Sequence, residues 1–364
     1  MKIVIDARES GTSTGRYIDK LVEYLYALKP EHHIIVATKE HRVDFMKNIA
    51  PGFEVRVAPF KEFSFAEQLG FKRFLDRLQA DLVHFGMVQQ PLLYRGRAVT
   101  TMHDLTTARF KNPSKNPFVF GIKQRVYVFV NRYVPRKSRQ IIVPSEYVKE
   151  DVLSFAGLKD ANKITVTYEA ADPITVPPEP VDGLGDSPFL LYVGRPTPHK
   201  NLERLIEAFQ LLRQAHPDLK LVLGGKKDVL YERIEQLLKR QGVVNVMFTG
   251  FVSEGQLRWL YENCAAYVFP SLSEGFGLPG LEAMIHGAPV VSSNATCLPE
   301  IYGEAARYFD PNEPERIAAA IDDVLTDAAL RNRLIVAGKE RARLFSWRRM
   351  AEQTLEVYEK ALKE

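Results

Sequence analysis

The sequence is poor in cysteine and lacks long apolar runs. Only Cys264 and Cys297 are present among 364 residues, and their spacing fits neither a disulfide framework nor a metal knuckle. We therefore predict two buried core residues with free thiols. No stretch approaches the roughly 20 apolar residues of a membrane-spanning helix, and the strand-like start has no signal-peptide pattern. These absences predict a cytoplasmic protein.

The sequence also has little excess of charge of either sign. Its net charge is +4, with 26% charged and 46% hydrophobic residues, which are the proportions of an ordinary globular protein. This composition excludes a disordered, collagen-like or coiled-coil chain. A mild positive excess gives no nucleic-acid footprint, so we expect no nucleic-acid partner.

Short β-branched runs alternate along the chain with longer segments of helical period. This alternation predicts an α/β protein with parallel sheets covered by helices on both faces. The first series of expected strands comprises residues 2–7, 34–38, 54–58, 82–85, 98–102 and 140–144, and the second comprises 189–194, 220–224, 244–249, 266–270, 289–292 and 306–309. The same architecture therefore occurs twice.

A stretch rich in proline and glycine, residues 172–188, separates the two series and favours neither helix nor strand. We therefore predict two Rossmann-like domains, residues 1–171 and 189–345, which face a cleft. A last segment, 346–364, has helical spacing after the N-cap candidate Ser346, and we expect it to pack back on the first domain.

The most informative segment runs from Glu274 to Glu282 and reads as a glycine loop that opens a helix after a buried strand. Such a loop presents backbone N–H groups at the positive end of the helix dipole, which is an anion site. The expected donors are Gly275, Phe276, Gly277 and Leu278. The two glutamates could accept hydrogen bonds from hydroxyl groups on either side of a bound phosphate. Alone, each would be an ordinary solvated residue.

Three further motifs follow expected strands. Gly194 and Arg195 end the first strand of the second domain, and Lys200 follows shortly after, so two cations could stabilise a diphosphate. His103 follows a strand of the first domain and could reach a ligand there. The alternative is a histidine with a purely structural role. The first loop carries Gly11, Gly15 and Arg16, with glycines four apart, which is not the dinucleotide-binding fingerprint.

Together these motifs resemble glycosyltransferase family 4, whose members are retaining enzymes of the GT-B fold, over nearly the whole chain. The resemblance is carried by Gly15-Arg-Tyr, His103-Asp104, Val143-Pro-Ser-Glu, Val193-Gly-Arg195 with Lys200-Asn201, Thr249-Gly-Phe-Val, Glu274 to Glu282, and Phe345-Ser-Trp. One departure is Gly-Thr-Ser-Thr-Gly in the first loop, where many relatives have adjacent glycines.

The resemblance implies a role for each matching residue. Arg195 and Lys200 would hold the donor diphosphate of a nucleotide sugar, Glu282 the ribose hydroxyls, and Glu274 with the following N–H groups the sugar and β-phosphate. His103 would reach the sugar, the loop from Gly11 to Gly15 would lie beside the phosphates, and Val252 would line the base pocket. It also implies retention at the anomeric carbon without a side-chain nucleophile. Because the chain has no Asp-x-Asp triplet, we expect neither a metal nor another cofactor.

The segment from Arg109 to Arg139 is basic, with interleaved aromatic residues and no Asp or Glu. In the domain where the family binds acceptors, it could rest on anionic lipid headgroups at the inner face of the cell membrane, or hold a phosphorylated, lipid-linked acceptor. The alternative is a helix with a basic solvated side and a core face. That face would comprise Phe118, Ile122, Val126, Phe129 and Tyr133.

We predict a retaining hexosyltransferase that moves mannose from GDP-mannose to a glycan or lipid-linked glycan in cell-surface polysaccharide synthesis. The mannose preference rests on the resemblance of Gly15-Arg-Tyr and His103-Asp-Leu to the corresponding segments of bacterial mannosyltransferases. A UDP-hexose donor is the main alternative. Two other classes stay open: a retaining glycosidase with Glu274 and Glu282 as its carboxylate pair, and a nucleotide-sugar binding module without turnover.

Overall fold

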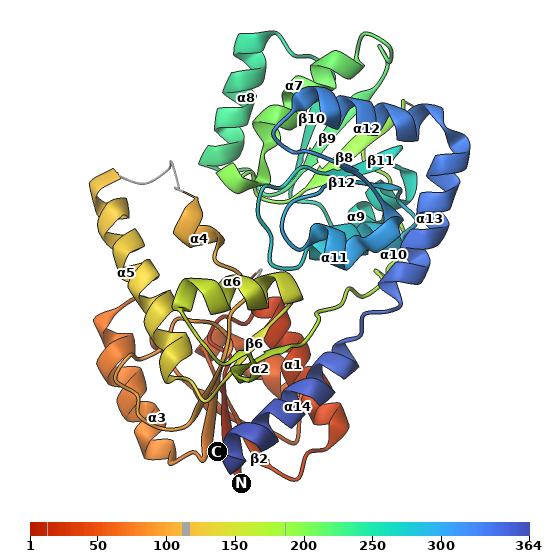
Figure 1. Ribbon diagram of the computed structural model, residues 1–364. Coiled ribbons are helices and arrows are strands. Elements are labelled where there is room, and N and C mark those ends of the chain that lie inside the picture. The colour runs from red at the N-terminus through yellow and green to blue at the C-terminus, as the bar shows by residue number, and fades with distance from the viewer. Residues whose placement is uncertain (13, 111–116, 186) are drawn as a thin grey trace. The chain divides into compact units, whose positions relative to one another are not determined.

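The structure is a computed structural model that describes residues 1–12, 14–110, 117–185 and 187–364, with only the backbone at 117–120 and 122. The described chain divides into two compact units. Unit 1 comprises Met1–Ala108, Ile122–Glu169 and Ser346–Glu364, and unit 2 comprises Arg109–Gly121 and Ala170–Phe345. Helices lie on both faces of the sheet in each unit (Figure 1).

The sheet of unit 1 is parallel, in the order β3-β2-β1-β4-β5-β6-β7. Its strands are β1 (Lys2–Asp6), β2 (His33–Thr38), β3 (Glu54–Val57), β4 (Leu82–Phe85), β5 (Ala98–Thr101), β6 (Gln140–Val143) and β7 (Ile164–Val166). The helices along this part of the chain are α1 (Gly15–Leu28), α2 (Val43–Ile49), α3 (Lys72–Leu78), α4 (Thr106–Arg109), α5 (Pro117–Lys137) and α6 (Glu146–Ala156). The central strands are buried, as apolar runs in a two-sided parallel sheet should be.

The sheet of unit 2 is also parallel, in the order β10-β9-β8-β11-β12-β13. Its strands are β8 (Phe189–Val193), β9 (Lys220–Gly224), β10 (Val246–Gly250), β11 (Ala266–Phe269), β12 (Val290–Ser293) and β13 (Ala306–Phe309). Its helices are α7 (Leu202–Leu212), α8 (Val229–Gln241), α9 (Glu254–Asn263), α10 (Leu278–Ile285), α11 (Leu298–Tyr302), α12 (Pro314–Thr326) and α13 (Ala328–Ala342). The predicted fold class, two Rossmann-like parallel-sheet domains, is confirmed.

The last helix, α14 (Trp347–Lys363), belongs to unit 1. The Ser346 side chain accepts a hydrogen bond from the Arg349 N–H, so the predicted N-cap is present. One face of the helix is buried, and its Tyr358 hydroxyl lies 2.6 Å from Nδ1 of His84 on β4. The final helix therefore completes the core of the first unit.

The segment between the two predicted domains has neither helix nor strand at residues 172–185 and 187–188. Both cysteines are free and buried, as predicted. Burial raises the pKa of the Cys264 and Cys297 thiols, which favours their neutral form as small core residues. Among the described residues, no helix is both long and apolar enough to cross a membrane.

Candidate active site

In unit 2, two neighbouring strands bring the candidate charges to the same edge of the sheet. Lys200 follows β8 and Glu274 follows β11, and these strands pair in parallel. The Lys200 Nζ lies 2.5 Å from Glu274 Oε1, and both side chains are largely buried. The loops are joined as well, because the Leu272 N–H donates to the His199 carbonyl. The structure therefore brings together a cation and a carboxylate that are 74 residues apart in sequence.

The glycine loop leads from Glu274 into α10 as the sequence predicts. Its backbone is fixed by side chains from the following helix region: the Glu274 N–H donates to Thr296 Oγ1, and the Tyr302 hydroxyl donates to the Gly277 carbonyl over 2.6 Å. Gly277 is the N-cap of α10 with φ 98°, and a Cβ there would lie 2.6 Å from the Tyr302 hydroxyl. Only glycine fits this position.

The remaining loop residues differ in what they present. Gly275 and Phe276 are buried and Leu278 is half-buried. The Phe276 ring packs edge-on against Phe345, with centroids 5.5 Å apart, so only its backbone is placed to meet a ligand. Among the described residues, no side chain makes a cap hydrogen bond at the start of α10, so the positive end of the helix dipole lies at the glycine loop.

Glu282 lies one turn into α10 and is half-buried. The Tyr261 hydroxyl donates to its Oε2 over 3.2 Å. Burial and the neighbouring Glu282 carboxylate raise the pKa of Tyr261 well above its usual value, so this donor keeps its proton. The carboxylate is thereby oriented by a residue that the motif alone does not reveal.

Arg195 lies at the same sheet edge but has a different partner from Lys200. Its side chain is 58% exposed, and its Nε lies 2.6 Å from Oδ2 of Asp228, the N-cap of α8. Burial opposes ionisation of Asp228, but Arg195 and the first N–H groups of α8 outweigh it and lower the pKa of the carboxyl. The turn before Arg195 is held by Tyr231, whose hydroxyl donates to the Gly194 carbonyl.

Val252 follows β10 and is half-buried, beside Phe251, whose ring is 84% exposed. Phe251 belongs to the sequence motif Thr249-Gly-Phe-Val. Its ring is open to solvent beside Val252, so Phe251 joins the candidates.

In unit 1, the first glycine loop leads into α1, of which Gly15 and Arg16 are the first residues. Gly11 has φ 79°, and its N–H donates to Asp19 Oδ2. Arg42 fixes the loop from a later segment, because its Nε donates to Ser10 Oγ. The Gly15 N–H at the start of α1 donates to Thr12 Oγ1 over 3.0 Å. Neither Asp19 nor Arg42 belongs to the sequence motif, so their role is found only in the structure.

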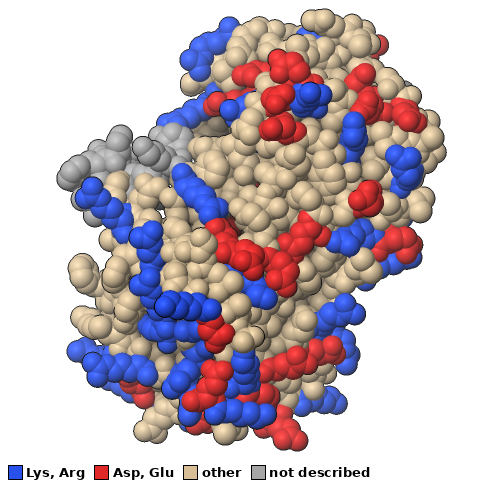
Figure 2. Space-filling view, in the orientation of Figure 1, with Lys and Arg blue, Asp and Glu red and all other residues tan. Residues whose placement is uncertain are grey.

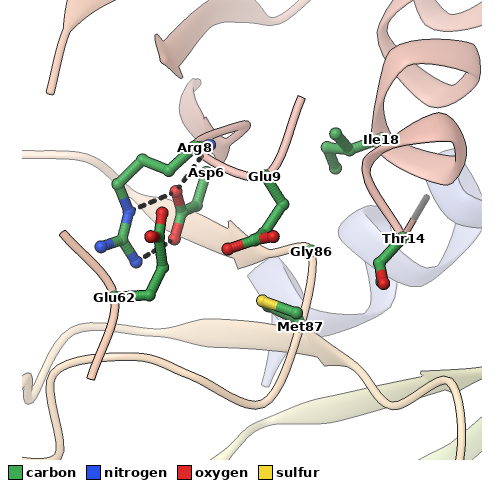
Figure 3. A pocket seen from close by; sticks show the side chains of 8 residues that line it. All are labelled: Asp6, Arg8, Glu9, Thr14, Ile18, Glu62, Gly86 and Met87. Carbon is green, nitrogen blue, oxygen red and sulfur yellow. Dashed lines mark hydrogen bonds and ion pairs between the residues drawn. The ribbon is translucent and has the colours of Figure 1, made fainter. Parts of the chain in front are cut away.

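A small pocket of unit 1 lies beside this loop. It is lined by Asp6, Arg8, Glu9, Thr14, Ile18, Glu62, Gly86 and Met87 (Figure 3). Arg8 makes two hydrogen bonds to Asp6 and one to Glu67, so its charge is matched within the core. Burial and the charge of Glu62 raise the pKa of Glu9. The carboxyl groups of Asp6, Glu9 and Glu62 line the pocket together with the guanidinium of Arg8, so acidic side chains predominate in the lining.

His103 follows β5 and contacts Gly86, one of the residues that line this pocket. Its Nε2 lies 3.0 Å from the Gly86 carbonyl, and its Nδ1 lies 3.2 Å from Glu169 Oε1. The Tyr17 ring meets the imidazole edge-on, with centroids 4.9 Å apart. Within the described residues, no group of three or more His, Cys, Asp or Glu side chains is placed to hold a metal ion.

The two parallel sheets and the charged glycine-loop site define a protein of the GT-B class of glycosyltransferases. The chain belongs to this class as a member of glycosyltransferase family 4: residues 14–174 match the model "Glycosyltransferase Family 4" and residues 180–341 match "Glycosyl transferases group 1". The resemblance inferred from the sequence is confirmed. The chain is therefore a glycosyltransferase, which decides against the glycosidase interpretation.

Several proteins are similar to the chain. O-antigen chain mannosyltransferase B of Escherichia coli is 33% identical over 285 residues, which are 72% of this chain and 70% of that protein. Serotype-specific mannosyltransferase WbdA of Escherichia coli is 37% identical over 181 residues, 48% of this chain but only 22% of that protein. Glycogen synthase of Mycobacterium tuberculosis is 30% identical over 71% of this chain and 62% of that protein.

Solved structures share the fold. Sucrose-phosphate synthase from Thermosynechococcus elongatus superposes with a TM-score of 0.76 at 20% identity and covers 99% of this chain and 98% of its own. At 20% sequence identity, this similarity shows a shared fold only.

Proposed function

We propose that the chain is a retaining, metal-independent hexosyltransferase that transfers mannose from GDP-mannose to a glycan or lipid-linked glycan in cell-surface polysaccharide synthesis. The observation that carries the proposal is the Lys200–Glu274 pair beside the uncapped N-terminus of α10. A cation, a carboxylate and the positive end of a helix dipole suit a diphosphate joined to a polyhydroxyl sugar. The choice of mannose is supported by the identity to O-antigen chain mannosyltransferase B.

Each site residue has a proposed role in holding the donor. Lys200 and Arg195 bind the diphosphate, and Glu274 with the N–H groups of Gly275, Phe276, Gly277 and Leu278 binds the β-phosphate and the sugar. Glu282 accepts hydrogen bonds from the ribose hydroxyls, and Val252 lines the base pocket together with the exposed Phe251 ring. In unit 1, we propose that His103 contacts the sugar and that the loop from Gly11 through Gly15 to Arg16 contacts the phosphates.

The proposed reaction needs no side-chain nucleophile and no cofactor. The bond between the anomeric carbon and the β-phosphate oxygen breaks, and the acceptor oxygen bonds to the same face of that carbon. As that bond breaks, its electron pair stays on the departing phosphate oxygen, and Lys200 and Arg195 stabilise the negative charge that develops on the diphosphate. The same oxygen then takes the acceptor proton. These side-chain cations take the part that a bridging metal plays elsewhere.

A donor assay tests the proposal. The purified chain is incubated with GDP-mannose, GDP-glucose, UDP-glucose and UDP-galactose, each with a mannose-terminated oligosaccharide, in EDTA and then in Mg²⁺. We expect GDP release and an α-linked product with GDP-mannose, equally in both buffers, with the anomeric configuration read by NMR. Turnover confined to UDP-glucose would support the alternative that the likeness to glycogen synthase favours.

The other outcomes of this assay are equally specific. Loss of activity in EDTA would contradict metal independence, and a β-linked product would contradict retention. Binding of nucleotide sugar with no product from any acceptor would support the binding-module alternative. Parallel reactions with a polyprenyl-diphosphate-linked oligosaccharide distinguish a lipid-linked acceptor from a free glycan.

We also propose that α5 rests on an anionic membrane surface. Lys and Arg side chains gather over α5 (Figure 2). The exposed fractions of Val126, Phe129 and Tyr133 are 54%, 56% and 38%, so these residues do not form the core face of the alternative interpretation. Phe118 and Ile122 have no described side chains, and Lys111 and Lys115 lie outside the described residues. Exposed aromatic rings among cations suit a lipid headgroup layer.

A further inference from the structure

Both ring nitrogens of His103 face groups that only accept hydrogen bonds. Nε2 lies 3.0 Å from the Gly86 carbonyl oxygen, so this nitrogen carries a hydrogen. Nδ1 lies 3.2 Å from Glu169 Oε1, and an ionised carboxylate can only accept. The two side chains are 17% and 8% exposed. With a hydrogen on each nitrogen, the imidazole is positively charged and has no free lone pair.

The charged groups around the ring favour this state. Burial lowers the pKa of His103, but the hydrogen bond and charge of Glu169, the Gly86 carbonyl and the charge of Asp104 outweigh it, and the pKa is raised. A charged His84 in the same core would oppose protonation of His103. Burial lowers the pKa of His84 to about 3, however, so His84 stays neutral. Tyr17 meets the ring edge-on and carries no charge.

Tyr17 is itself held in place through the core. Its hydroxyl lies 3.1 Å from Thr101 Oγ1, which lies 2.8 Å from Nε2 of His84, and the other nitrogen of His84 lies 2.6 Å from the Tyr358 hydroxyl. The orientation of the His103 ring is therefore fixed on one side by this packed chain and on the other by Glu169.

We infer that Glu169 is a positioning residue of the transfer reaction: it holds His103 as an imidazolium whose two N–H groups are both engaged, so that the ring is unable to take the acceptor proton. The inference rests on the proposed function, because it assumes that His103 contacts the transferred sugar. It deepens that function, since a ring with both nitrogens donating leaves the proton to the departing phosphate oxygen.

The chemistry of the pair argues against a purely structural role. A buried ion pair costs desolvation, and a neutral glutamine could hold Nδ1–H equally well without that cost. A carboxylate at this position does what glutamine would not: it keeps the ring charged. Glu169 also lies at the end of unit 1, beyond β7, where no catalytic motif would be sought.

The test combines protonation and rate. In the full chain with ¹⁵N-labelled histidine, the His103 nitrogen shifts are followed between pH 5 and 9, and kcat and KM for the donor are measured over the same range. We expect the wild-type ring to titrate above the ordinary histidine value of about 6.5. In Glu169→Gln the ring should titrate at a lower pH than in wild type, and the pH above which kcat falls should move down with it.

The matched control is Glu359→Gln, which removes the carboxylate 2.7 Å from Nε2 of His32 elsewhere in unit 1. This variant should leave the His103 titration and the rate profile unchanged. A wild-type His103 that titrates at or below the ordinary histidine value of about 6.5, or a Glu169→Gln profile that matches wild type, would overturn the inference. The nitrogen shifts need no substrate and no variant, so failure of the proposed function, seen as absent wild-type turnover, is distinguishable from failure of the inference.

Discussion

At the scale of single residues, the Lys200–Glu274 pair places a positive and a negative charge side by side in the candidate site of unit 2. The ammonium lies 5.2 Å from the centroid of the Phe269 ring and 2.5 Å from a carboxylate oxygen, so it is held close to the loop that follows β11. A charge held in a fixed position stabilises developing negative charge without reorganisation. In the proposed function, Glu274 keeps the cation in place until a diphosphate replaces or joins it.

Lys200→Ala should therefore lower kcat with the best donor by about 10²–10³-fold, the loss typical of one preorganised charge. Steady-state kinetics across the donor panel measures this change. The matched control is Lys227→Ala, because Lys227 is 58% exposed and pairs with Glu235 at the surface. If both variants turned over donor at the wild-type rate, the diphosphate assignment would be wrong.

The neutral His84 makes folding sensitive to acid. Because burial lowers its pKa to about 3, only the unfolded chain binds the proton as pH falls below about 6.5, the ordinary histidine value. Its contribution is complete above pH 6.5 and declines by about 1.4 kcal/mol per unit as pH falls toward 3. Urea unfolding at pH 7.5, 5.5 and 4.5 should show a shallower decline for His84→Gln than for wild type. Equal slopes would contradict the assignment.

At the scale of elements, α10 depends on the glycine that begins it. Gly277 combines φ 98° with a close approach to the Tyr302 hydroxyl, whereas Gly242, after α8, has φ 63° and open space at its Cβ position. The two glycines therefore separate backbone strain from steric fit.

Gly277→Ala should cost more unfolding free energy than Gly242→Ala, for which only the left-handed strain of about 1–2 kcal/mol applies. It should also weaken nucleotide binding, because the loop amides move with the helix start. Chemical denaturation and isothermal titration with GDP measure the two effects. Equal stability losses with unchanged GDP affinity would contradict this account of the loop.

The exposed face of α5 is the second element with a testable role. Arg125→Gln with Arg132→Gln should reduce binding to vesicles that contain 30% phosphatidylglycerol, and wild-type binding should weaken from 0.1 M to 0.5 M salt as charges are screened. The control pair, Arg331→Gln with Arg333→Gln on α13, removes equally exposed cations elsewhere. Vesicle binding that is equal for both double variants would contradict the α5 surface.

At the scale of the whole molecule, both sheets follow from the alternation of apolar runs and helical segments. All twelve predicted strands are present within one or two residues, because a buried parallel strand is a continuous apolar run. The strand that the sequence analysis missed, β7, has three residues, two of them half-buried, and so carries almost no periodic signal.

The site was predictable only in part. Local motifs identify Lys200 and Glu274, because each follows a recognisable strand. The partners of Arg195 and His103 are not local: Asp228 lies 33 residues from Arg195, and Glu169 lies 66 residues from His103. Asp228 is recognisable as an N-cap, but spacing does not reveal which cation it meets.

Donor binding should also be visible in the stability of the whole chain. A ligand at about 100 times its Kd adds about 2.7 kcal/mol to the folded state. GDP-mannose should therefore raise the Tm of wild type in differential scanning fluorimetry, and more than UDP-glucose does at the same concentration. Lys200→Ala should lose this increase, and a larger increase with UDP-glucose would favour the alternative donor.

The placement of α14 has a consequence for how the protein is made. Unit 1 buries Tyr358 against His84, 274 residues earlier in the chain, so its interior stays open until α14 has been synthesised. Most of unit 2, Ala170–Phe345, is contiguous and leaves the ribosome before α14 does. Domains usually fold in their order of synthesis. Here the second unit can fold while the first still lacks α14, and a chain that stops before residue 346 would leave the first unit unfinished.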